Sequence, residues 1–81
     1  MRILVADDHD HVRETIAAFL RSEGMIEVVT AENLETAVEF AAKSGSFDLV
    51  LLDYDMPGMD GLAGLKRMSD ANDGNPVAIL S

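Results

Sequence analysis

The chain has no cysteine, no tryptophan and few basic residues. The absence of cysteine excludes disulfide bonds and thiolate metal sites. Six basic residues stand against fifteen acidic ones, which gives a formal net charge of −9. This balance disfavours binding to nucleic acid or to anionic membranes, because both require clustered lysine and arginine. The same balance favours cations and basic protein surfaces as partners.

Long hydrophobic runs are also missing. No apolar stretch approaches the roughly 20 residues that a membrane-spanning helix needs. The first apolar segment, "ILVA", follows Met1 and Arg2 directly without a signal peptide, so we expect a cytoplasmic location. A chain of 81 residues can form at most one small domain, and an apolar content of 48% is enough to give that domain a packed core.

Short apolar segments alternate with segments of helical spacing. We expect strands at residues 2–6, 26–30, 48–52 and 76–81. The intervening helices have expected caps at Asp10, Asn33 and Asp60 and expected stops at Gly24 and Gly45. The apolar stripes include Val12, Ile16, Phe19 and Leu20 in the first helix and Leu62, Leu65 and Met68 in the third. The order β-α-β-α-β-α-β predicts an α/β fold, with a parallel sheet covered by helices.

Polar side chains follow three of the predicted strands. They are Asp7, Asp8 and His9 after the first strand, Asp53 and Asp55 after the third, and Ser81 after the fourth. Because parallel strands end at the same edge of a sheet, we expect these groups to share one rim. Two carboxylates about 5 Å apart at an effective dielectric constant of ~20 repel by on the order of 3 kcal/mol. Folding must therefore raise one pKa or recruit a cation.

Oxygen ligands that face open solvent are suited to Mg²⁺, and a carboxylate beside such an ion can attack phosphorus. A single aspartate at a strand end is more simply interpreted as a solvated loop residue. Four carboxylates grouped as "DD" and "D-x-D" favour the cation site instead. We interpret His9 and His11 as exposed residues of a first helical turn, because nothing pairs them as ligands.

Three segments carry a resemblance to a known family. "ILVADDHDHVRE", "DLVLLDYDMPGMDGL" and "PVAILS" resemble the receiver domain of bacterial two-component response regulators, in order and spacing, over the whole chain. The resemblance implies a doubly wound, flavodoxin-like parallel sheet. It also implies that residues 1–81 are the N-terminal two thirds of a receiver domain, without its fourth helix, fifth strand and fifth helix.

The resemblance assigns roles to the rim residues. Asp53 would be the phosphoacceptor, taking a phosphoryl group from a sensor histidine kinase in a reaction that requires Mg²⁺. Asp8 would bind the ion directly and Asp7 through water, while Asp55 would offer its backbone carbonyl. The receiver would itself be no enzyme beyond its own phosphorylation and dephosphorylation, and it would switch an output, transcription, in the full-length protein.

Other positions complete the comparison. Pro57 and Gly61 would shape the loop after the acceptor, and Ser81 would be the switch hydroxyl that bonds the phosphoryl oxygen. The family's phosphoryl-contacting lysine lies on the fifth strand, and Lys43 and Lys66 do not match it. We therefore expect weak Mg²⁺ binding and slow phosphorylation by a small phosphodonor.

The fourth strand should form an apolar sheet edge, and apolar surface beside the first helix should be uncovered. We expect self-association as a dimer, through that strand or by exchange of elements. One alternative is an assembly module that dimerises without signalling, although the joint presence of Asp7, Asp8, Asp53 and Ser81 favours an active parent protein. A haloacid-dehalogenase-type phosphotransferase also uses "D-x-D", but places it after the first strand and needs a longer chain. That family usually has threonine or valine at the fourth position after the first aspartate, where this chain has Pro57.

Overall fold

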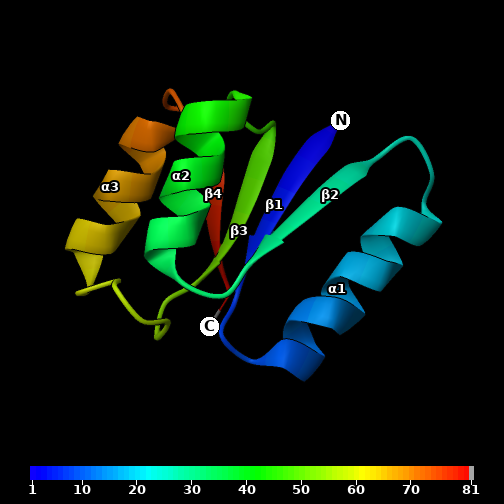
Figure 1. The fold of residues 1–81 in the computed structure, drawn as a ribbon, viewed down its shortest axis with the longest axis horizontal. Coiled ribbons are helices and arrows are strands. Elements are labelled where there is room, and N and C mark those ends of the chain that lie inside the picture. The colour runs from blue at the N-terminus through cyan, green and yellow to red at the C-terminus, as the bar shows by residue number, and fades with distance from the viewer. Residues whose placement is uncertain (81) are drawn as a thin grey trace.

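The computed structural model describes residues 1–80 as a four-stranded parallel sheet flanked by helices (Figure 1). The elements are β1 (Arg2–Ala6), α1 (Asp10–Ser22), β2 (Glu27–Ala31), α2 (Leu34–Ser44), β3 (Leu49–Asp53), α3 (Leu62–Ala71) and β4 (Val77–Leu80). The strand order is β2-β1-β3-β4, and all three pairings are parallel. This architecture confirms the α/β order predicted from the sequence and the doubly wound form implied by the resemblance.

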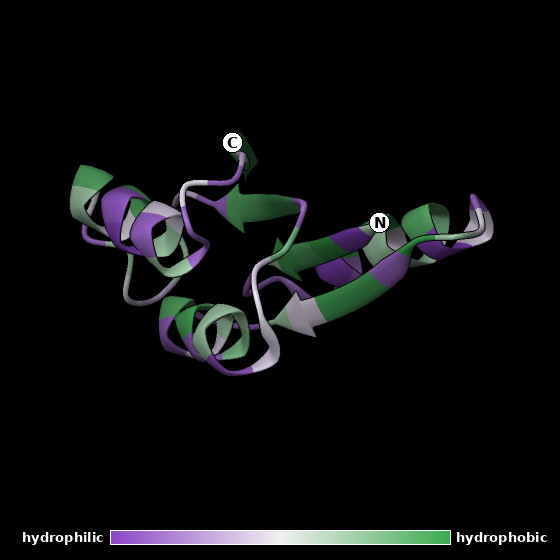
Figure 2. Cartoon of the chain, turned by 90° about the horizontal axis from the view of Figure 1, so that it is seen from above, coloured by the Kyte–Doolittle hydropathy of each residue, from purple (hydrophilic) through white to green (hydrophobic). Residues whose placement is uncertain are grey.

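The main core lies between the sheet and the pair α2 and α3. Leu4, Val50 and Leu52 point to this side and are fully buried. Side chains alternate along a strand, so Ile3 and Val5 point to the opposite face, where α1 packs. The strands are mostly hydrophobic in colour, whereas the helices carry both colours, as expected for a sheet covered on both faces (Figure 2).

The helix ends agree only in part with the predictions. Asn33 caps α2 as expected, because its side chain accepts a hydrogen bond from the Thr36 N–H, and Gly45 ends that helix with a φ of 91°. The predictions for Asp10 and Asp60 are wrong. Asp10 is the first residue of α1 and its carboxylate binds Arg13, while the residue that precedes α3 is Gly61.

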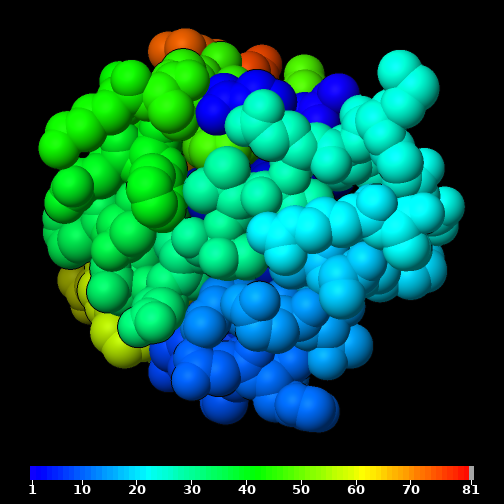
Figure 3. Space-filling model, turned by 45° about the vertical axis from the view of Figure 1, so that its right-hand side comes forward, coloured from blue at the N-terminus to red at the C-terminus, as the bar shows by residue number. Residues whose placement is uncertain are grey.

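Parts of the apolar stripes are exposed, and for α1 this agrees with the expectation that apolar surface beside this helix is uncovered. The buried line of α1 runs through Arg13 and Ala17, and Val12 and Phe19 lie on a flank of the helix that nothing in residues 1–80 covers, with 45% and 63% of their surface exposed. The outer side of α1 lies open beside β2 in the space-filling view (Figure 3). Leu62 at the start of α3 is 72% exposed. None of the three described helices has the length and hydrophobicity needed to cross a bilayer.

Candidate functional site

The register of the sheet brings two aspartates side by side. β1 pairs with β3 so that Ala6 lies beside Leu52, and the next residue along each strand is Asp7 and Asp53 respectively. Four residues, Asp7, Asp8, His9 and Asp53, each present a ligand atom, and these atoms all lie within 4.8 Å of one another. The structure thus brings together three of the four predicted rim carboxylates, Asp7, Asp8 and Asp53, but not Asp55.

The members of this carboxylate cluster differ in exposure. Asp7 and Asp53 are buried, with 4% and 5% of their surface exposed, whereas Asp8 and His9 lie open to solvent. The cluster therefore has a buried floor and an accessible mouth.

Asp53 is the least satisfied member of the cluster. Its Oδ1 accepts a hydrogen bond from the Asp55 N–H at 3.2 Å, but its buried Oδ2 has no hydrogen-bond partner. Burial raises the pKa of Asp53, and the neighbouring carboxylate of Asp7 adds to the increase, against the hydrogen bond from Asp55. A buried carboxylate oxygen without a partner is costly, so this atom is suited to bind a cation or to accept a hydrogen bond from a ligand.

The pKa of Asp7 is shifted in the opposite direction to that of Asp53. Burial alone would raise the pKa of Asp7, but hydrogen bonds from the backbone and ring of His9, the interaction with Asp53 and the charge of His9 together outweigh burial, so the pKa is lowered. The His9 N–H donates to Asp7 Oδ1 at 2.8 Å. Asp7 and Asp53 are thus neighbouring carboxyl groups whose pKa values are shifted in opposite directions.

His9 belongs to the cluster, contrary to the expectation that it is a simple exposed helix residue. Its Nδ1 lies 2.9 Å from Asp7 Oδ1, 3.2 Å from Asp8 Oδ1 and 3.5 Å from Asp53 Oδ2. The hydrogen bond with Asp7 raises the pKa of His9, and the charges of the neighbouring aspartates add to this. The available sequence signal was its place directly after Asp8 on the predicted rim.

Arg13 is a second residue that the sequence reasoning missed. It is buried, and its Nη1 donates to the backbone carbonyl of Asp7 at 2.9 Å while its Nη2 binds Asp10 Oδ1 at 2.7 Å. It therefore fixes the turn from β1 to α1, which carries Asp7 and Asp8. Arg13 lies off the apolar stripe predicted for this helix, so nothing in the pattern identified this role.

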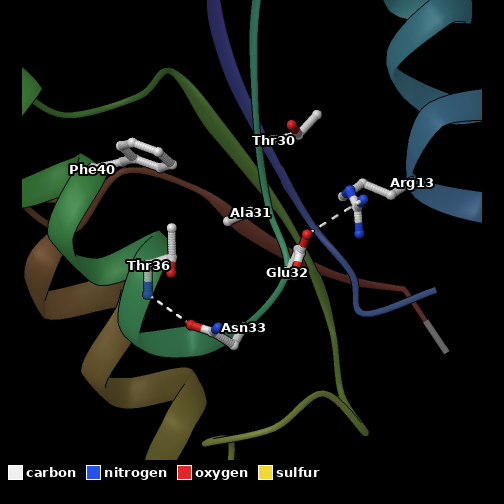
Figure 4. A pocket seen from close by; sticks show the side chains of 7 residues that line it. All are labelled: Arg13, Thr30, Ala31, Glu32, Asn33, Thr36 and Phe40. Atoms are coloured by element: carbon white, nitrogen blue, oxygen red, sulfur yellow. Dashed lines mark hydrogen bonds and ion pairs between the residues drawn. The ribbon is translucent and has the colours of Figure 1, made fainter. Parts of the chain in front are cut away.

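A hollow of about 230 Å³ opens beside Arg13 at the carboxyl end of β2 (Figure 4). Its lining residues are Arg13, Thr30, Ala31, Glu32, Asn33, Thr36 and Phe40. Glu32 reaches toward Arg13, and Asn33 is already engaged in capping α2 (Figure 4). None of the described side-chain oxygens lining the hollow is both buried and unpartnered, in contrast to Asp53 Oδ2 in the carboxylate cluster.

The loop after Asp53 connects the cluster to the helices. The carbonyl of Pro57 accepts a hydrogen bond from the Leu34 N–H at 3.1 Å, and Gly61 has a φ of 63°, which glycine adopts easily. Asp55 is exposed, and its backbone N–H, rather than its side chain, contacts Asp53. Ser81, the expected switch hydroxyl, lies outside the described residues.

The donor set fits a divalent cation. Three carboxylates at one rim, one of them with an unpartnered buried oxygen, match the preference of Mg²⁺ for a few oxygen ligands with open positions for water or substrate. Such an ion would offset the repulsion within the cluster and leave the accessible mouth free.

Comparison with known proteins places this chain in a family. The profile of the response regulator receiver domain matches residues 3–81. The chain is 38% identical to a glycerol metabolism activator from Pseudomonas putida, over 99% of this chain and 37% of that protein. It is 42% identical to a protein-glutamate methylesterase/protein-glutamine glutaminase from Archaeoglobus fulgidus, over 100% of this chain and 23% of that protein.

Solved structures agree with the sequence matches. The receiver domain of the hybrid histidine kinase CckA superimposes with a TM-score of 0.86 at 38% identity, covering 98% of this chain and 73% of that one. The chain therefore spans well under half of either curated relative and about three quarters of this solved receiver. The fold, the profile match and the relatives together show that this chain belongs to the receiver domain family of two-component response regulators.

Proposed function

We propose that Asp53 accepts a phosphoryl group from the phosphohistidine of a sensor histidine kinase, in a reaction that needs Mg²⁺ held by Asp7, Asp8 and Asp53. The observation that carries this proposal is the buried Asp53 Oδ2, which has no hydrogen-bond partner and faces the other two carboxylates across the cluster. The backbone carbonyl of Asp55 and the hydroxyl of Ser81 are the proposed further contacts to the ion and to the phosphoryl group.

Phosphoryl transfer to this site requires a carboxylate nucleophile and a positive charge that offsets the negative charges of the aspartates and the phosphoryl group. An oxygen of Asp53 attacks phosphorus, the phosphorus–nitrogen bond of the donor breaks, and the electron pair remains on the departing imidazole. A bound divalent ion supplies charge neutralisation for the incoming phosphoryl group. Asp7 and Asp8 would hold that ion in place. Burial, and to a smaller extent the charge of Asp7, raises the pKa of Asp53, and a bound cation would favour its charged form.

The experiment that tests this function is incubation with acetyl phosphate, followed by intact mass measurement. We expect one added phosphoryl group per chain with Mg²⁺ and none with EDTA. The reaction should be slow, because the two lysines, Lys43 and Lys66, are exposed and pair with Glu39 on α2 and Asp70 on α3 instead of with the carboxylate cluster. Uptake that is equally fast with EDTA would contradict the proposal.

The wider role concerns a longer protein. We propose that residues 1–81 form the N-terminal two thirds of a receiver domain in the cytoplasm, where phosphorylation controls an output and the receiver itself turns over no other substrate. A transcriptional output is supported by the similarity to the cell cycle transcriptional regulator CtrA of Caulobacter vibrioides, and the methylesterase relatives suggest an enzymatic output as the alternative.

We also propose that the 81-residue chain associates with itself through β4. This strand lies at the edge of the sheet, and nothing in residues 1–80 pairs with its outer side. Ile79 is 40% exposed, and a hollow of about 430 Å³ beside α3 is lined in part by Leu65 and Val77. Unpaired backbone groups beside exposed apolar side chains favour strand addition by a second copy.

Sedimentation velocity tests this association. We expect a dimer at micromolar concentration that dissociates on dilution, and a weaker dimer when Ile79→Lys places a charge on the edge strand. A folded monomer throughout that range would contradict the proposal.

The same measurement with beryllofluoride and Mg²⁺ separates a signalling receiver from an assembly module. The oligomeric state of a signalling receiver should respond to this phosphoryl mimic, whereas that of a module that serves only for assembly should not.

A further inference from the structure

We propose that the imidazole of His9 occupies the cation position of the carboxylate cluster in the metal-free chain and must turn outward before Mg²⁺ can bind. His9 would thereby set the metal affinity of the site. This inference rests on the proposed function, because it takes Asp7, Asp8 and Asp53 as the residues that hold the ion.

The position of Nδ1 is the first observation. This one atom lies 2.9, 3.2 and 3.5 Å from oxygens of Asp7, Asp8 and Asp53. Mg²⁺ sits about 2.0–2.1 Å from its oxygen ligands. An ion that coordinates these three oxygens must lie near all of them, as Nδ1 does, so the ring and the ion would compete for the same space. The ring and the ion therefore cannot both hold that position.

The choice of ligand atoms is the second observation. Mg²⁺ prefers oxygen donors and binds imidazole nitrogen poorly, unlike the later transition metals. For Mg²⁺ the ring is accordingly a competitor and not a fourth ligand. In the metal-free chain it donates or shares a proton with Asp7, which partly relieves the repulsion within the cluster but leaves Asp53 Oδ2 without a hydrogen bond.

The ring has a free way out. The His9 side chain is 66% exposed, and its described contacts are all with the three aspartates. His9 precedes α1 with an extended backbone, φ −88° and ψ 102°, and no side-chain capping bond. Rotation about its side-chain torsion would therefore break no helix contact. Its backbone N–H can stay bonded to Asp7 throughout.

Mg²⁺ titration of purified variants by calorimetry tests the inference. We expect His9→Ala to bind Mg²⁺ about 3- to 10-fold more tightly than the natural chain, the scale of a lost hydrogen bond. His9→Asn keeps an amide donor near the place of Nδ1 and should fall between the two. His11→Ala is the matched control, because His11 is exposed on α1 and outside the cluster, and should bind as the natural chain does.

A second readout follows the ring itself. The chain has only two histidines, so their ring resonances can be assigned by substitution. We expect Mg²⁺ to shift the His9 Nδ1 resonance strongly and that of His11 hardly at all. Equal Mg²⁺ affinity of the natural chain and His9→Ala, or weaker binding by the variant, would overturn the inference alone. If neither the natural chain nor any of these variants binds Mg²⁺, or if Asp53→Asn binds it as tightly as the natural chain, the metal site itself is contradicted as well.

Discussion

Replacing Asp53 by asparagine is expected to abolish phosphoryl uptake and, at the same time, to make the fold more stable at neutral pH. The loss of uptake follows from removing the proposed nucleophile. The gain in stability follows from removing a buried charge that faces Asp7. Two charges about 5 Å apart at an effective dielectric constant between ~20 and ~40 repel by roughly 1.5–3 kcal/mol, so a gain of about 1–2 kcal/mol is reasonable.

The sign follows from proton linkage. The pKa of Asp53 in the folded chain lies above its ordinary value, so the folded state binds this proton more tightly than the unfolded state does. The contribution of Asp53 to stability therefore falls as the pH rises from the ordinary carboxyl pKa through the raised one. At neutral pH the loss is complete, and an uncharged asparagine avoids it.

Thermal unfolding in metal-free buffer at pH 7 measures the effect. About 1 kcal/mol corresponds to roughly 4–8 °C in the melting temperature of a domain of this size. Asp70→Asn is the matched control, because Asp70 is exposed on α3 and its replacement changes the net charge by the same amount. An Asp53→Asn chain that is less stable than the natural one, or that still gains a phosphoryl group, would contradict the account.

Gly64→Ala is expected to destabilise the fold severely. An added Cβ would lie 2.1 Å from the Met59 carbonyl oxygen and 2.6 Å from the Met59 Cα, so backbone must move. Alanine favours a helix over glycine by about 1 kcal/mol, which offsets only part of an overpacking cost that here lies at or above the usual 1–3 kcal/mol. We expect a net loss of at least about 2 kcal/mol, a large share of the stability of a small domain.

Urea unfolding followed by circular dichroism measures this loss. Leu62→Ala, at a side chain that is 72% exposed on the same helix, should change stability by less than about 0.5 kcal/mol. The contact also bears on the candidate site, because Met59 belongs to the loop that joins Asp53 to α3. A Gly64→Ala chain as stable as the natural one would show that α3 does not pack on this loop as described.

Much of the fold followed from local patterns in the sequence. Buried parallel strands read as apolar runs, and the run from Leu49 to Leu52 became β3 within one residue of the expected bounds. The carboxylate cluster followed from topology, because Asp7 and Asp53 directly follow paired positions of neighbouring parallel strands. These features depend on periodicity and on the direction of strands, which the sequence carries explicitly.

Other features depend on contacts that no local pattern reports. Asn72 is fully buried and exchanges hydrogen bonds with the backbone of Phe47, 25 residues earlier, at 2.6 and 3.1 Å. Arg13 can be buried because its guanidinium donates a hydrogen bond to the backbone carbonyl of Asp7. The helical pattern placed it off the apolar stripe and suggested only a polar surface position. The exposure of Val12 and Phe19 likewise depends on what covers the flank of α1, and spacing alone cannot supply that information.

The measurement that tests the central claim most directly is a structure of this chain with Mg²⁺ and beryllofluoride. The account predicts beryllofluoride on an oxygen of Asp53 and a Mg²⁺ ion between Asp7, Asp8 and Asp53, with the His9 ring turned out to solvent. Beryllofluoride or the ion bound elsewhere, with the cluster unchanged and His9 still seated among the carboxylates, would contradict it.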